Sequence, residues 1–248
     1  VTAFVLAVVC IGLLIKLYLL ATLAALVALG LLLRWSWLNG AHPQAAPLIG
    51  NEPLEAPLHS RTRSGPGLWG TSVALMANGT LYLSLLFGWF YYWTVAPQWT
   101  VPAAAPVALL PLFGSGALLS AAALWYRYAL LRLRRGDDRI LRASCHGVVA
   151  LGLLHSGWLL SLLLNAGLEP TVRAHDAVLC VVFGYLLLHS CLAVLLTVLQ
   201  GRRVACGYVN RHLPYEPEVL WLFWAYSLGI FWTSYAAFFL LPLAWGAS

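Results

Sequence analysis

The chain has 248 residues, of which 62% are hydrophobic and 9% are charged, and its mean hydropathy is +0.83. Because a soluble domain carries about 25% charged residues, this composition excludes a water-facing globule, and the low charge also excludes a disordered chain. A helix needs about 20 residues to cross the roughly 30 Å hydrocarbon layer of a bilayer, so the length allows about seven crossings. The sequence therefore predicts a polytopic, all-α membrane protein.

The first 38 residues are too long for one crossing, yet they contain no proline and no cluster of turn residues. Lys16 and Tyr18 lie where a tight connection between two helices would fall, and Arg34 and Trp35 mark the end of the second. We predict two transmembrane helices over residues 1–38, with one long tilted helix as the alternative.

Charge-free intervals locate the remaining helices. A polar, proline-rich segment at residues 39–67 is predicted to be a cytoplasmic loop, and residues 68–248 are predicted to form a five-helix transmembrane bundle. The interval 64–126 has no charge, but its prolines split it into two helices. The predicted spans cover residues 68–93, 106–131, 144–168, 177–201 and 219–248.

Positive charges alternate between rich and poor loops along the chain, as the positive-inside rule expects. We therefore predict seven transmembrane helices with the N-terminus inside and the C-terminus outside. The positive residues behind the net charge of +6 thus indicate the orientation of the chain in the membrane, and no nucleic-acid partner is expected. The loops rich in positive charge contain Arg34, Arg61 and Arg63, then the group from Arg132 to Arg142, then Arg202, Arg203 and Arg211. Of the two poor loops, residues 94–105 contain no positive charge and the other contains Arg173 alone.

The cysteines show no CxxC spacing, and four of the five lie in or beside apolar spans. We predict buried free thiols rather than a disulfide framework or a metal site, and no HExxH motif or phosphate-binding glycine loop occurs. The five are Cys10, Cys145, Cys180, Cys191 and Cys206.

Ionisable groups inside a membrane are costly, so each one is a functional candidate. Lys16 and Arg127 lie near span ends, where Arg127 can extend its side chain to the interface. His146 and His155 are nine residues apart, which places them on opposite sides of one helix, and His189 lies in the middle of its span.

These residues leave two chemical alternatives open. Ser115, within Gly114–Gly116, could serve as a nucleophile with His189 as its base, although a small-residue packing face explains the same motif. His189 and His155 could ligate a haem from two helices, although hydrogen-bonded histidines explain them equally. No carboxylate lies at the depth where a proton-driven transporter needs one. Because few residues within the spans could carry out catalysis or bind a cofactor, the sequence favours a subunit that supports a catalytic partner.

Several features follow one another in a fixed order from the third predicted helix to the last. They are Gly67–Gly70 and Phe87–Trp93 at the two ends of the third helix, Pro106, Gly114–Gly116 and Trp125–Tyr128 in the fourth, the turn Arg135–Arg139, His189 in the sixth, and the aromatic stretch Trp221–Trp232. In this order they resemble cytochrome c oxidase subunit III, the seven-helix subunit of haem–copper oxidases that carries no redox centre. The first two helices match this family in topology alone.

The sequence departs from the family pattern at two places. Asn78 stands where family members place a glutamate deep in the third helix, and Tyr226 and Gly229 replace the histidine and aspartate of the final helix. The proton-handling role that the family associates with that glutamate therefore does not carry over to Asn78. Asn78, His155, His189 and Tyr226 are the candidate structural or functional polar positions, and no catalytic, cofactor-binding or metal-binding residue is assigned.

The resemblance implies a scaffold role in aerobic respiration. It implies contacts with oxidase subunits I and II, phospholipid held between the first two helices and the other five, and cytochrome c or quinol reached through the complex. Haem and copper are expected in the catalytic partner, and no cofactor is expected in this chain. Together with the scarcity of lysine, it implies the cytoplasmic membrane of a bacterium, either as a separate subunit or as the subunit III portion of a fused subunit I/III chain.

Overall fold

The structure is a computed structural model, and it describes residues 2–39, 48–49, 52–53, 66–95, 105–135, 137–206, 209 and 215–246. The chain divides into two compact units, residues 1–56 and 57–248, and each is described by itself. Most of the predicted loop at residues 39–67 and of the loop at 94–105 lies outside the described residues. Within the first of these loops, strands β1 (Leu48–Ile49) and β2 (Glu52–Pro53) pair antiparallel.

The first unit contains two helices, α1 (Thr2–Leu14) and α2 (Tyr18–Asn39), where the sequence left one long helix as the alternative. The chain turns between them at Lys16, whose φ of 61° lies in the left-handed region that a non-glycine residue rarely adopts. That conformation ends α1 within three residues of the start of α2. At 13 residues, α1 is shorter than a membrane crossing requires, so two crossings in this unit stay a prediction.

Small side chains hold α1 and α2 together. Ala21, Ala24 and Ala28 repeat at helical spacing on α2 and are buried. A Cβ atom on Gly12 of α1 would lie 3.1 Å from the Cβ atom of Ala21, which is closer than ordinary contact. The two helices therefore approach at a distance that only small residues allow.

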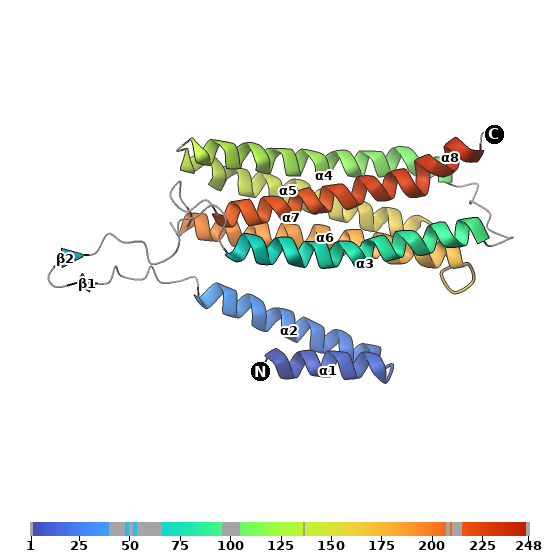
Figure 1. The fold of residues 1–248 in the computed structure, drawn as a ribbon, viewed down its shortest axis with the longest axis horizontal. Helices are drawn as coiled ribbons and strands as arrows, with labels where there is room; N and C mark the ends of the chain where they lie inside the picture. Colours follow the sequence, from blue (N-terminus) through green and yellow to red (C-terminus); the bar gives the residue numbers. More distant parts are fainter. Residues whose placement is uncertain are drawn as a thin grey trace. The chain divides into compact units, whose positions relative to one another are not determined.

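The second unit is a bundle of five long helices, which run side by side in Figure 1. Among the described residues, these five are long and apolar enough to cross a membrane, which supports a multi-pass membrane protein and confirms that a long apolar helix occupies each of the five predicted intervals. They are α3 (Pro66–Val95), α4 (Ala105–Arg134), α5 (Asp138–Asn165), α6 (Ala174–Ala205) and α7 (Tyr215–Tyr235), the last continuing through a π-helical turn, η1 (Ala236–Leu240), into α8 (Leu241–Gly246).

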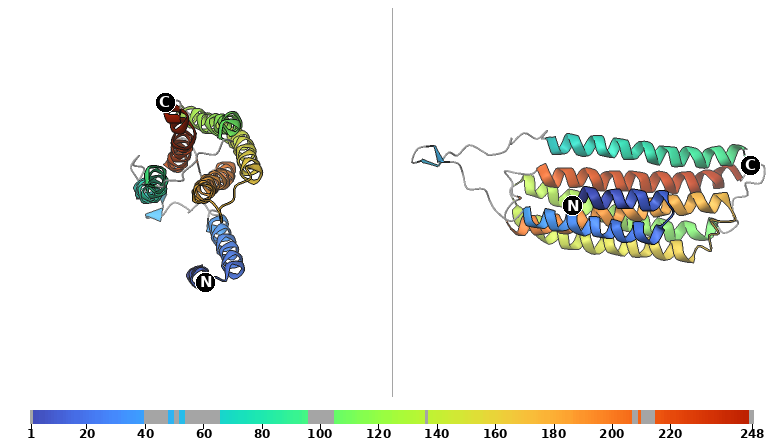
Figure 2. Two further views of the ribbon diagram at one scale, coloured as in Figure 1. Left: turned by 90° about the vertical axis from the view of Figure 1, so that its right-hand side faces the viewer. Right: turned by 90° about the horizontal axis from the view of Figure 1, so that it is seen from below.

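Helices α6 and α7 pack on each other, and each also packs on two other helices of the bundle. Helix α4 packs on α5, α5 packs on α6, and α7 contacts α3, α4 and α6, as the end-on view of Figure 2 shows. Aromatic side chains fill the centre, where Trp89, Tyr126, Trp224 and Phe231 are almost completely buried. Because α3 packs mainly on α7 and α6, much of its surface faces outward, which is usual for a helix in contact with lipid.

Ion pairs tie three helices at the end of the bundle where the sequence places its arginine-rich loops. Arg203 of α6 donates two hydrogen bonds, each 2.7 Å long, to the carboxylate of Glu216 at the start of α7. Arg134 at the end of α4 donates to Glu218 over 2.8 Å. Arginines that the sequence reports only as markers of orientation therefore also connect α4 and α6 to α7.

Candidate functional site

A cluster of polar side chains joins α3, α6 and α7 inside the bundle. The amide nitrogen Nδ2 of Asn78 lies 2.6 Å from Nε2 of His189. The hydroxyl of Tyr185 lies 2.7 Å from that of Tyr226 and 3.3 Å from the backbone carbonyl oxygen of Asn78. We call these four residues the amide–histidine cluster.

The hydrogen bonds of this cluster fix the proton positions. Nδ1 of His189 lies 2.8 Å from the carbonyl oxygen of Tyr185, and because a carbonyl only accepts, Nδ1 carries the proton. Nε2 is then an acceptor, and the Asn78 amide donates to it. Tyr226 donates to the Tyr185 hydroxyl, which in turn donates to the Asn78 carbonyl. The two tyrosine hydroxyls, Nδ1–H of His189 and one N–H of the Asn78 amide thus each have an acceptor within the cluster.

Local sequence places each member. Tyr185 and His189 are four residues apart on α6 and therefore share one face, with ring centroids 4.2 Å apart. On α3, Gly79 follows Asn78, and a Cβ atom at Gly79 would lie 3.9 Å from the Tyr226 ring. The ring of Tyr226 on α7 therefore lies against α3 next to Asn78, at an ordinary van der Waals distance from position 79.

A second cluster joins α4, α5 and α6. His155 is completely buried, with its Nδ1 atom 2.8 Å from the carbonyl oxygen and 2.9 Å from the hydroxyl oxygen of Ser115. Its Nε2 atom lies 3.1 Å from the hydroxyl of Ser190. Because the carbonyl oxygen only accepts, Nδ1 carries the proton and Nε2 is an acceptor. The Ser190 hydroxyl has one proton, and its hydrogen bond is shared between Nε2 of His155 and the carbonyl oxygen of Leu186. We call Ser115, His155 and Ser190 the serine–histidine cluster.

The two clusters meet on α6 at adjacent residues. His189 belongs to the first and Ser190 to the second, and neighbouring residues of a helix point about 100° apart. One polar layer thus runs from α3 and α7 through α6 to α4 and α5. Every long helix of the bundle contributes to it.

Of the four polar positions singled out in the sequence, Asn78, His189 and Tyr226 lie in one cluster and His155 lies in the other. His146 is exposed on α5, as its spacing from His155 predicts, and its Nδ1–H donates to a carbonyl of its own helix.

The structure corrects the expected partner of Ser115. The sequence paired it with His189 as a nucleophile and base, whereas Ser115 contacts His155, and His189 is bonded to Asn78. Helix α5 lies between α4 and α6, so Ser115 on α4 meets the histidine of α5 rather than that of α6. Helical periodicity within each span does not predict this order of helices. All four ring nitrogens of His155 and His189 have protein partners, so neither ring offers a free lone pair to a haem iron.

The cysteines are free, as predicted, but only partly buried. Cys145 is buried and Cys180 partly so, whereas Cys10, Cys191 and Cys206 are exposed on the helix surfaces. An apolar membrane helix presents apolar side chains to lipid as well as to its neighbours, so an apolar context does not imply burial. Within the described ranges, no three histidine, cysteine or acidic side chains gather as metal ligands.

Several interhelical hydrogen bonds were not predicted from the sequence, of which two are examples. The hydroxyl of Tyr82 on α3 lies 2.8 Å from that of Ser234 on α7, and the indole nitrogen of Trp224 donates to Thr197 over 3.1 Å. Isolated polar residues in charge-free spans were the available signal. Such a residue in a membrane helix either bonds to its own backbone or seeks a partner on a neighbour.

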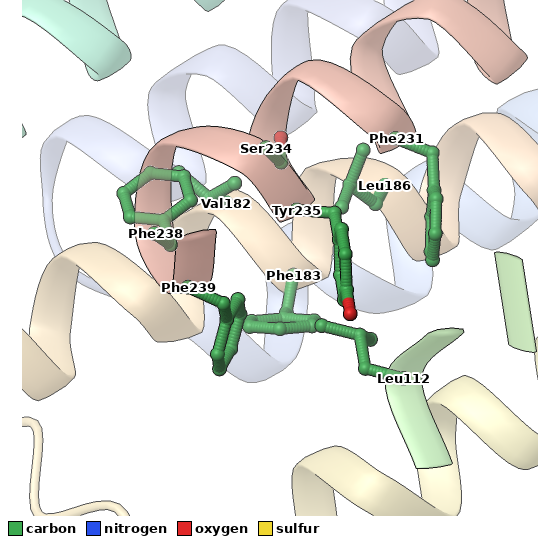
Figure 3. A pocket seen from close by; sticks show the side chains of 9 residues that line it. All are labelled: Leu112, Val182, Phe183, Leu186, Phe231, Ser234, Tyr235, Phe238 and Phe239. Atoms are coloured by element: carbon green, nitrogen blue, oxygen red, sulfur yellow. The ribbon is translucent and has the colours of Figure 1, made fainter. Parts of the chain in front are cut away.

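A small apolar pocket lies beside the π-helical turn η1, between α6 and α7 (Figure 3). Its lining is mainly aromatic and aliphatic. The hydroxyls of Ser234 and Tyr235 are its polar groups, and they are bonded to Tyr82 and to the carbonyl oxygen of Leu109. The pocket therefore presents no free polar group to a ligand.

The chain matches no protein-family model and no curated protein sequence.

The contact between Asn78 and His189 is expected to couple α3 to α6. In a double-mutant cycle of N78A, H189A and the combined variant, we expect a coupling energy of about 0.6 kcal/mol and at most about 1.7 kcal/mol, the average and the maximum for interhelical hydrogen bonds in membranes. The measurement is unfolding of the purified chain in mixed micelles, followed by circular dichroism. Ser84, which bonds only to its own helix backbone, supplies the control pair, S84A with H189A, for which additivity is expected. Additivity for both pairs would contradict a direct Asn78–His189 bond.

Proposed function

We propose that the chain is an accessory subunit of a haem–copper terminal oxidase, similar to cytochrome c oxidase subunit III, and that it supports oxygen reduction without carrying a redox centre. In this proposal it packs against the catalytic subunit, keeps it active during turnover and binds phospholipid. Haem and copper belong to the partner, and electrons arrive through the complex from cytochrome c or quinol.

The observation that carries this proposal is the convergence of Asn78, His189 and Tyr226. Asn78 and Tyr226 come from the order of motifs in the family, and His189 is both an ionisable residue in its span and the histidine that resembles the family's sixth helix. Positions one or two residues away on these helices point about 100–200° away from the shared cluster, since each residue turns a helix by about 100°. Asn78 bonds His189, whose ring centroid lies 5.6 Å from that of Tyr226.

The convergence also supports an explanation for the departures from the family pattern. A glutamate at position 78 would place a carboxylate beside His189, whereas asparagine supplies an uncharged donor to the same nitrogen. Tyr226 likewise supplies a neutral hydroxyl from the final helix. We propose that this chain keeps the contact among three helices and gives up the ionisable group.

The topology is part of the same proposal. Seven transmembrane helices, with the N-terminus in the cytoplasm and the C-terminus outside, agree with the alternation of arginines. The membrane would be the cytoplasmic membrane of a bacterium, and the chain would be either a separate subunit or the subunit III portion of a fused chain.

Purification in mild detergent tests the assignment. We expect the chain to co-purify with a larger haem-containing, copper-containing subunit, and the complex to consume oxygen and to show a Soret band. The same chain expressed alone, the matched control, should show no Soret band. A stable monomer isolated from its native membrane with no oxidase subunit would contradict the proposal, and so would a haem bound by the chain itself.

A further inference from the structure

Arg127 places a cation within the predicted span of α4, where α4 borders α7 on the outside of the bundle; we call this border the outer seam. The guanidinium carbon of Arg127 on α4 lies 5.1 Å from the centroid of the Trp221 ring on α7, a cation–π distance. Arg127 precedes Arg134 by seven residues, which is about two turns and about 10 Å along the helix. Both arginines therefore lie on the face of α4 that borders α7.

Among the described residues, Arg127 differs from Arg132 and Arg134 in having no anionic partner. Arg134 pairs with Glu218 at 2.8 Å, and Arg132 pairs with Asp137 at 2.9 Å. Within the described part of the chain, Arg127 makes no ion pair and no hydrogen bond, so the ring of Trp221 is its only charge-related contact. A guanidinium group held over a ring still offers its N–H edge, which matches the two oxygens of a phosphodiester.

The depth of Arg127 suits a lipid headgroup. Helix α4 has 30 residues and is about 45 Å long, so its ends extend beyond the roughly 30 Å hydrocarbon layer. Two turns from its end, an arginine side chain reaches the level of the phosphates. Tyr128, which is 52% exposed, and Trp221 are side chains of the kind that gather at this interface.

The surface beside Arg127 is apolar and open. Leu124 and Leu131 lie about one turn before and after it and are 62% and 41% exposed. An acyl chain can therefore lie along α4 over Leu124, toward the middle of the span. A free inorganic anion would use the cation and leave this surface uncovered.

We propose that Arg127 and Trp221 form a binding site for the phosphodiester group of a membrane phospholipid, whose acyl chain lies along α4. This site is on the outer seam of the second unit, and it requires no oxidase partner. It is therefore independent of the proposed function and of the lipid expected between the first two helices and the other five.

Native mass spectrometry of the purified full chain tests the site. The chain in detergent is titrated with phosphatidylglycerol, and the apparent Kd of the tightest lipid adduct is compared between variants. We expect R127Q to weaken this Kd about tenfold, and R127K, which keeps the charge but loses the planar fork, to weaken it less. The control is R135Q, which removes the same charge from an exposed residue directly after α4, and we expect its Kd to change less than twofold.

Each other outcome overturns the proposal. Equal loss in R127Q and R135Q would indicate general attraction of anionic lipid to this end of the bundle. No loss in R127Q would indicate that Arg127 only extends to the interface or meets a carboxylate of another protein. Displacement of the lipid by millimolar inorganic phosphate would indicate a site for a free anion. Circular dichroism of each variant shows that it is folded before the comparison is made.

Discussion

Replacing His155 with alanine is expected to lower the free energy of unfolding by about 2–4 kcal/mol. The side chain is completely buried, so its removal leaves a cavity that the surrounding helices cannot fully close. It also leaves the hydroxyls of Ser115 and Ser190 without the ring nitrogens that they contact. Unfolding in mixed micelles, followed by circular dichroism, measures the loss.

His146 supplies the matched control for this change. It lies on the same helix, is exposed, and donates to the carbonyl oxygen of Arg142 one turn before it. We expect H146A to change the unfolding free energy by less than about 0.5 kcal/mol, as is usual for a surface substitution. Equal effects of H155A and H146A would show that the serine–histidine cluster does not stabilise the bundle.

Replacing Gly152 with valine should cost about 1–3 kcal/mol of stability, because the new side chain has no space. A Cβ atom at this position would lie 2.5 Å from Cγ2 of Val194 on α6 and 3.2 Å from the Trp224 ring on α7. Val194 is β-branched and stiff, and Trp224 is completely buried, so neither can move aside without disturbing α5, α6 and α7 together. Thermal unfolding in detergent is the measurement.

Gly157 on the same helix is the control for this substitution. A Cβ atom there would meet nothing within 4 Å. The variant G157V makes the same chemical change in the same helix, so it separates the effect of crowding from that of helix propensity. We expect its stability to stay within about 0.5 kcal/mol of the parent chain. Similar losses in G152V and G157V would contradict the close packing of α5 against α6 and α7.

The five long helices could be predicted from the sequence because charged residues mark most of their ends and prolines divide the charge-free interval 64–126. The break at Lys16 could also be predicted, since a single charged residue interrupts an apolar stretch too long for one crossing. Within a span, however, lipid-facing and core-facing positions are both apolar, so the sequence does not distinguish Gly152 from Gly157 or Cys145 from Cys191. The bundle arrangement makes that distinction.

The candidate site was predictable as a set of residues but not as a set of contacts. His155 and His189 are conspicuous as ionisable groups in apolar spans, and Asn78 and Tyr226 emerged from the resemblance. Which serine contacts which histidine depends on the order of helices around the bundle, and this order follows from long-range packing rather than from local pattern. The pairing of Ser115 with His155 illustrates this limit.

The adjacency of His189 and Ser190 has a consequence for how the bundle can move. A rotation of α6 by one residue, about 100°, would carry His189 away from Asn78 and Ser190 away from His155 in the same step. The helix therefore cannot exchange partners on one side while keeping those on the other. A turn of α6 therefore changes its contacts with α3 and with α5 in the same step.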